Sequence, residues 1–111
     1  ERSSEAEKAE CIVQEEVGSF IEWLSSLEQA PTITALVEKL ELIRQKEITK
    51  SLSGGLKDLS ERQKQAMEDM TAAMMKKFLH APIMHLKQNT DSEYELMYIA
   101  ALKRLFDLED Q

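Results

Sequence analysis

The feature that most constrains this chain is a spacing of three and four residues between apolar side chains, repeated along segments almost free of proline and glycine. Residues 5–28 contain no proline and one glycine, and their apolar residues at this spacing are Val13, Val17, Phe20, Leu24 and Leu27. The pattern predicts one long helix with a packing seam. Trp23 lies beside the seam, next to Phe20 and Leu27, so we expect this end of the helix to bury two faces.

The four residues 29–32 interrupt the pattern and predict the start of a second helix. Pro31 suits the first turn of a helix, where its missing N–H would be unbonded in any case. The apolar residues expected to face a core are Ile33, Leu36, Val37, Leu40, Ile43 and Ile48. This helix should stop at residues 53–55, where Gly54 and Gly55 can adopt the left-handed conformation that caps helix ends.

Two capping boxes predict the later helices. Ser60 with Gln63 opens a helix that ends before Pro82, and residues 83–88 are expected to form a short helix of their own. Thr90 with Glu93 opens the last helix. The apolar stripes are Met67, Met70, Met74 and Phe78 in the first case and Tyr94, Tyr98, Ala101, Leu105 and Leu108 in the second. The sequence therefore predicts an all-α fold, with one long N-terminal helix followed by an antiparallel bundle of about four further helices.

Size and charge exclude several classes of function. A chain of 111 residues has room for one modest domain, not for a nucleotide-binding domain plus a substrate domain. Because the chain begins with an acidic residue and not with methionine, we expect it to be a piece of a longer protein. Residues 1–28 carry a net charge of −6, residues 29–88 of +3 and residues 89–111 of −4, and the basic middle lacks interleaved aromatic residues. We therefore expect no direct binding of nucleic acid.

The longest apolar runs are only a few residues, so no membrane span is expected. One cysteine, Cys11, cannot form an internal disulfide, and this fits a cytoplasmic location. Its acidic neighbours disfavour the reactive thiolate.

His80 and His85 are five residues apart, which is unsuited to a helical metal pair, and His80 is expected to bind free carbonyls at a helix C-terminus. Arg44 is expected to be partly buried with an acidic partner. The sequence thus predicts no catalytic, cofactor-binding or metal-binding residue.

The apolar seams point instead to self-association. They supply more apolar surface than one small chain can cover, and a twofold dimer uses the same patch on each copy. The residues expected at this dimer interface are Met67, Met70, Met74, Phe78, Tyr98, Ala101 and Leu105.

Several segments, in order, resemble the C-terminal region of glutamyl-tRNA reductases. They are residues 12–17, Phe20, Trp23-Leu24, Ser26-Leu27, Pro31-Thr32-Ile33, Ala35-Leu36, Ile43-Arg44, Glu47, residues 78–82, Leu86-Lys87 and residues 105–108. Residues 78–82 are similar to the family's Leu-Leu-His-x-Pro segment. Val37 departs from the family, which commonly has Arg there.

The resemblance implies that residues 1–28 are the end of the long "spinal" helix of that enzyme and that residues 29–111 are its helical dimerisation domain. It further implies a parent enzyme that uses NADPH to reduce glutamyl-tRNA to glutamate-1-semialdehyde, in tetrapyrrole biosynthesis. The family's catalytic cysteine lies in another domain, and Cys11 lacks its context. The parent, not this segment, would bind the tRNA and NADPH.

Two alternatives stay open at the level of sequence. One is a small all-α dimeric enzyme of the chorismate mutase type, which would need several buried cations around a dianion, with Lys39, Arg44 and Lys50 as the available ones. The other is a stand-alone helical adaptor.

Overall fold

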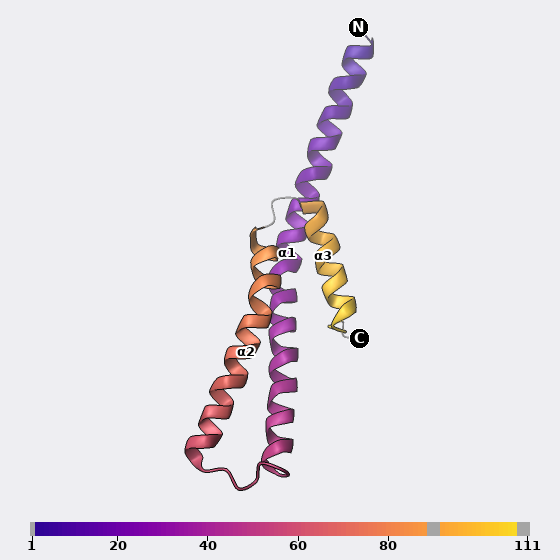
Figure 1. Ribbon diagram of the computed structural model, residues 1–111. Coiled ribbons are helices and arrows are strands. Elements are labelled where there is room, and N and C mark those ends of the chain that lie inside the picture. The colour runs from indigo at the N-terminus through magenta and orange to yellow at the C-terminus, as the bar shows by residue number, and fades with distance from the viewer. Residues whose placement is uncertain (1, 89–91, 109–111) are drawn as a thin grey trace.

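The computed structural model describes residues 2–88 and 92–108, and all the regular structure in these two ranges is helical. Helix α1 spans Arg2–Leu52, α2 spans Glu61–Gln88 and α3 spans Ser92–Leu105. Helices α1 and α2 form an antiparallel hairpin, and α3 lies beside the middle of α1 (Figure 1). The all-α class predicted from the sequence is confirmed.

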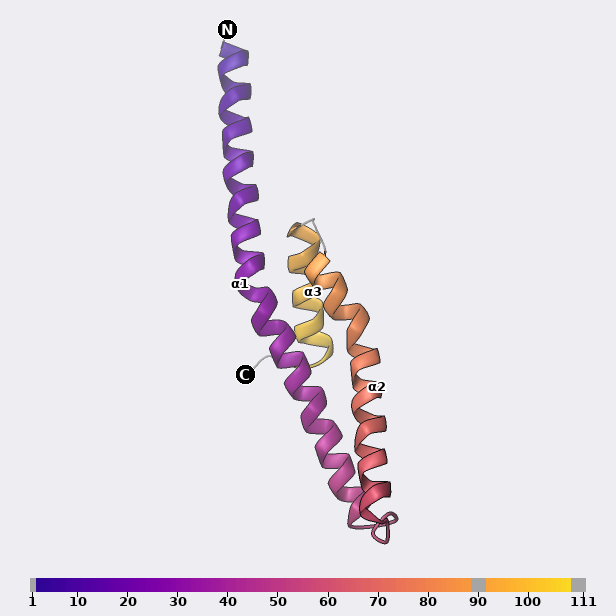
Figure 2. The same ribbon diagram turned by 90° about the vertical axis from the view of Figure 1, so that its left-hand side faces the viewer.

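The chain is strongly elongated. It measures 83 × 27 × 16 Å with a radius of gyration of 21.9 Å, against about 13 Å for a compact domain of this length. Figures 1 and 2 show why: the N-terminal half of α1 extends beyond both other helices. Every side chain from residue 4 to residue 20 is exposed.

The predicted break between a first and a second helix is wrong, because α1 runs through Pro31 without interruption. Proline in a helix interior removes one hydrogen bond and clashes with the preceding turn. A hydrogen bond that spans the proline and the burial of residues just after it offset that loss. The Thr32 side chain is buried and its hydroxyl donates to the Glu28 carbonyl at 2.7 Å, and Leu36, one turn further, is 1% exposed.

The predicted end of the next helix before Pro82 is also wrong. Helix α2 continues through Pro82 to Gln88, so residues 83–88 are its last turns and not a separate helix. Leu79 and Leu86 are buried on either side of the proline and hold the helix in place. His80 is therefore exposed in the interior of α2 and does not cap a helix end. Together the two prolines account for the difference between five predicted helices and the three in the described ranges.

The expected stop of α1 is confirmed in position but not in mechanism. The helix ends at Leu52, yet the described glycines all lack a positive φ, so Gly54 and Gly55 are not left-handed caps. The Ser51 carbonyl instead accepts from Gly54 N–H at 3.1 Å and from Leu56 N–H at 2.9 Å. A tight turn thus satisfies the last carbonyls without the left-handed conformation.

The capping box at the start of α2 is confirmed. The Ser60 N–H donates to Gln63 Oε1 at 2.9 Å, and the Gln63 N–H donates to Ser60 Oγ at 3.2 Å. The second box involves Thr90, which lies outside the described residues. Helix α3 ends in a Schellman-type turn, in which Asp107 has a φ of 51° and Leu108 N–H donates to the Lys103 carbonyl at 2.8 Å.

The core is small and lies between α1 and the two shorter helices. Its buried apolar residues in the described ranges are Leu36, Ile48, Leu79, Leu86 and Ile99. The predicted core positions Val37 and Ile43 are exposed, because α2 and α3 leave that part of α1 uncovered. The seam of the N-terminal half is also exposed within this chain, with Phe20 and Trp23 more than half exposed, so the expected burial of two faces is not seen here.

Helix α3 buries a face adjacent to the predicted one. Ile99 and the carboxylate residue Glu95 face α1, whereas Tyr94, Tyr98 and Leu105 point outward. Gln29 on α1 makes this possible, because its amide donates both to Glu95 Oε1 and to the Leu86 carbonyl of α2. A buried carboxylate with a hydrogen-bond donor is tolerated, and here the donor ties all three helices together.

Candidate functional site

An apolar groove lies between the C-terminal half of α1 and the N-terminal half of α2. We call it the hairpin groove. It encloses about 340 Å³, and its walls include Leu40, Ile43, Ile48, Met67, Met70 and Met74. Ile43, Met70 and Met74 remain 45–57% exposed along it. The lining is thus apolar, with flexible thioether side chains that adapt to an opposing surface.

A second apolar groove, which we call the α3 groove, lies between the C-terminal half of α2 and α3. It encloses about 410 Å³ and is lined by Leu102 and by Pro82, His85, Leu86, Tyr98, Ala101 and Leu105. Leu105 is 79% exposed, the largest exposed fraction among the big apolar side chains of the described ranges.

The structure places six of the seven residues predicted for an interface in these two grooves. Met67, Met70 and Met74 line the hairpin groove, and Tyr98, Ala101 and Leu105 line the α3 groove. The seventh, Phe78, is 64% exposed on the stretch of α2 between the grooves. At 100° per residue, Met67, Met74, Phe78 and His85 fall on one side of α2. Met67, Met70, Met74 and Phe78 therefore follow one track along α2, which we call the α2 track, whereas Tyr98, Ala101 and Leu105 lie on α3.

Sequence reasoning missed Leu40 and Ile43 as part of this surface, because their spacing also fits the core face of α1. Predicting that these two residues line an open groove would have required knowing where α3 ends along α1. That helix covers α1 only as far as its own end, and the remaining part of α1 stays open.

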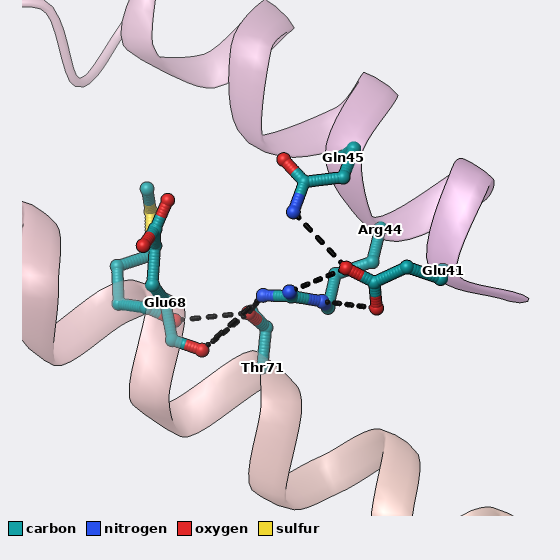
Figure 3. A network of polar contacts seen from close by, with 6 residues as sticks. Glu41, Arg44, Gln45, Glu68 and Thr71 are labelled. Atoms are coloured by element: carbon teal, nitrogen blue, oxygen red, sulfur yellow. Dashed lines mark hydrogen bonds and ion pairs between the residues drawn. The ribbon is translucent and has the colours of Figure 1, made fainter.

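The polar part of the hairpin groove is centred on Arg44, as Figure 3 shows. Its guanidinium donates to both carboxylate oxygens of Glu41, at 2.6 and 3.0 Å, and across the groove to Thr71 Oγ1 at 3.0 Å and the Glu68 carbonyl at 3.3 Å. The Arg44 side chain is only 12% exposed. The expected partly buried arginine with an acidic partner is confirmed, and it joins α1 to α2.

The Arg44 network also determines the acidity of Glu41. Hydrogen bonds from Arg44 and then from Gln45 lower the pKa of Glu41 from 4.5 to about 2, because they favour the charged carboxylate. The pair raises the pKa of Arg44 in turn. Glu41 thus stays ionised throughout the physiological range.

The three cations considered for a dianion site do not converge on an open site. Arg44 is engaged by Glu41 and Thr71, and Lys39 donates to the Asp107 carbonyl at 3.0 Å, while Lys50 is exposed two turns beyond Arg44. Cys11 is exposed on the N-terminal half of α1. Within residues 2–88 and 92–108, groups of three or more potential metal-binding side chains are absent. No helix in the same ranges is both long and apolar enough to cross a bilayer.

The exposed area of the chain is large for its mass. It amounts to 8753 Å², about 2,500 Å² more than the roughly 6,200 Å² expected of a compact monomer of 12.7 kDa. Part of this exposed area belongs to large apolar side chains such as Phe78, Met70 and Leu105, and exposed apolar surface is typical of domains that associate with other chains. The fold and the two grooves therefore define an elongated helical association domain.

Comparison with known proteins identifies the family. Residues 8–108 match the family described as glutamyl-tRNA(Glu) reductase, dimerisation domain, and the chain belongs to this family. The resemblance drawn from the sequence is thus confirmed, and the chorismate mutase and adaptor alternatives are set aside.

Among the curated relatives, the glutamyl-tRNA reductase of Geotalea daltonii is 44% identical over 98% of this chain. That of Geobacter sulfurreducens is 43% identical over the whole chain, and that of a Picosynechococcus species is 36% identical over 99% of it. The match covers only 25–26% of each relative, so the chain spans about a quarter of their length. No solved structure matches the chain.

Proposed function

We propose that this chain holds two copies of a glutamyl-tRNA reductase together. In this assignment residues 29–111 form the self-associating part, and residues 1–28 lead towards the rest of the enzyme. The observation that carries the proposal is the set of large apolar side chains left exposed along the two grooves, because obligate interfaces are rich in such side chains. Membership of a family described as a dimerisation domain supports it.

The parent enzyme would carry the chemistry. As the family resemblance implies, it would reduce glutamyl-tRNA to glutamate-1-semialdehyde with NADPH, for tetrapyrrole synthesis in the cytoplasm. This chain would contribute neither the catalytic cysteine nor the NADPH site. The engaged state of Arg44 and Lys39 supports that division, because neither cation is free to bind an anionic substrate.

Light scattering coupled to size exclusion tests the self-association. At tens of micromolar we expect a particle of twice the 12.7 kDa of the chain. A particle of 12.7 kDa would overturn the proposal. A fluorescence titration with NADPH tests the division of labour, and micromolar binding would contradict it.

A further inference from the structure

Helix α1 changes direction where it passes the first turn of α3. Figure 2 shows its N-terminal half running along one line and its C-terminal half inclined towards α2, and the change lies level with the start of α3. Pro31 is at this place, because Gln29, two residues before it, is hydrogen-bonded to Glu95 in the first turn of α3. Kinks in helices arise at proline and where a side chain bonds into the backbone ladder. The bend thus has its local cause among these residues.

The backbone hydrogen bonds of α1 are altered in the turn before Pro31. Proline has no N–H, so the Leu27 carbonyl loses the donor that a regular helix would supply. The Thr32 hydroxyl donates to the Glu28 carbonyl at 2.7 Å, which is also the acceptor for the Thr32 N–H in a regular helix. Such bonds from serine and threonine bend helices. The two altered carbonyls are neighbours, so α1 bends more easily here than along its regular turns.

The N-terminal half of α1 is a lever attached to this bend. Every side chain from residue 4 to residue 20 is exposed, so no other part of the described chain fixes its direction. From its start at Arg2 to Pro31 the helix rises about 44 Å. A change of about 10° at the proline therefore moves the far end by roughly 8 Å. Small changes at residues 27–32 become large displacements of the segment that leads away from the hairpin.

Helix α3 bridges the bend. On the side before the proline, the Gln29 amide donates to Glu95 Oε1. On the side after it, Lys39 Nζ donates at 3.0 Å to the carbonyl of Asp107, just beyond the end of α3. Ile99 lies between these two contacts in the sequence of α3 and is completely buried. One short helix thus contacts α1 on both sides of the proline.

We propose that Pro31 is a hinge in α1 and that α3 holds this hinge at one angle. With the contacts of α3 in place, the two halves of α1 move as one body. When the contact to Gln29 or to Lys39 is lost, the N-terminal half swings about the proline. The inference goes beyond the proposed function and uses one part of it, that residues 1–28 lead towards the rest of the enzyme. It concerns the direction in which that rest stands on this domain and not the association of two copies.

The order of the two halves relative to each other tests the hinge. Residual dipolar couplings of the backbone N–H groups in the full 111-residue chain measure it, with residues 8–24 as one segment and residues 36–50 as the other. In the wild type we expect a relative order parameter of about 0.85, the value of a rigid backbone. Gln29→Leu removes the donor to Glu95 and should lower it below about 0.6. Lys39→Met should lower it as well, whereas Lys46→Met, at an exposed position nearby on α1, is the matched control and should leave it unchanged.

A double substitution separates the proline from α3. Alanine at position 31 restores the donor to the Leu27 carbonyl, so in the chain that carries both Gln29→Leu and Pro31→Ala the relative order parameter should return to about 0.85. A double variant as disordered as Gln29→Leu alone overturns the hinge at Pro31. Wild-type order in both the Gln29→Leu and the Lys39→Met chains overturns the role of α3, even where the α3 signals show that this helix has detached. Sedimentation velocity on the same samples reports association separately, so a monomeric wild-type chain would overturn the proposed function and leave this inference standing.

Discussion

The two halves of α1 have the same kind of apolar seam but different surroundings. In the C-terminal half, Leu36 and Ile48 are almost completely buried within the chain. In the N-terminal half, Val13, Val17 and Phe20 repeat at the same spacing and remain more than half exposed. Within one helix, the apolar seam is therefore buried by the same chain in one half and left exposed in the other.

The difference teaches that helical periodicity marks a face meant for contact but does not say which chain supplies the contact. The same holds within α2, where Leu79 is buried and Phe78, the residue before it, is 64% exposed on the α2 track. Burial in a single chain therefore separates the residues that fold this domain from those available for association.

The largest expected effect compares one leucine in each half of α1. Leu36→Ala removes a side chain that is 1% exposed and should lower the free energy of unfolding by about 2–5 kcal/mol. Leu27→Ala removes one that is 51% exposed and should cost less than about 1 kcal/mol. Urea denaturation at one fixed chain concentration measures both. Equal losses would contradict the contrast between the halves.

The junction of the two halves gives the next effect. Pro31→Ala should raise the free energy of unfolding by about 1–3 kcal/mol, because alanine restores the backbone donor missing inside a continuous helix. If Pro31 instead began a separate helix, its replacement would be neutral or destabilising. Thermal melts of the two chains, with Ala30→Ser as a neighbouring control, distinguish these cases.

A smaller effect is expected at the two serines near predicted helix starts. Ser60→Ala removes the hydroxyl that accepts the Gln63 N–H in the capping box, and this loss should lower the free energy of unfolding by about 1 kcal/mol. Ser4→Ala lies on the exposed N-terminal half and should change stability by no more than about 0.5 kcal/mol. A larger loss at Ser4 in urea denaturation would show that the N-terminal half is part of the cooperative fold.

The smallest effect concerns the acid behaviour of the hairpin groove. Because folding lowers the pKa of Glu41 from 4.5 to about 2, its pair with Arg44 stabilises the folded chain above pH 4.5, and this contribution is lost as the pH falls towards 2. The carboxyl carbon of Glu41, followed by NMR, should titrate near 2 in the wild type and closer to 4.5 in Arg44→Gln. A wild-type titration midpoint near pH 4.5 would show that Arg44 does not stabilise the charged form of Glu41.

Local signals in the sequence predicted much of the fold, because they act within one turn of helix. The Ser60 capping box and the end of α1 near Gly54 are examples. The two proline positions could not be predicted in the same way. Whether a helix continues through Pro31 depends on tertiary packing around it: Thr32 and Leu36 are buried, and the nearby Gln29 bonds to Glu95, 66 residues away in sequence.

The helical spacing singled out some of the residues that line the two grooves, but the shape of the grooves was not predicted. The α2 track contains the three methionines and Phe78 that the spacing singled out, because an apolar stripe that a small core does not bury stays exposed. The buried face of α3 was not predicted correctly, because a glutamate such as Glu95 is normally exposed. Its burial depends on the hydrogen bond from Gln29 of α1, which the sequence does not indicate. The opening of the hairpin groove follows from where α3 ends, and no local pattern encodes that.

The central claim is that the folded chain completes its core only by pairing with a second copy. The concentration dependence of the urea unfolding midpoint tests this most directly, because coupled folding and association stabilise the folded state by about 1.4 kcal/mol for each tenfold rise in chain concentration. Between 1 and 100 µM the midpoint should therefore rise steadily. A midpoint that stays constant over this range would show a domain that folds alone and would contradict the account.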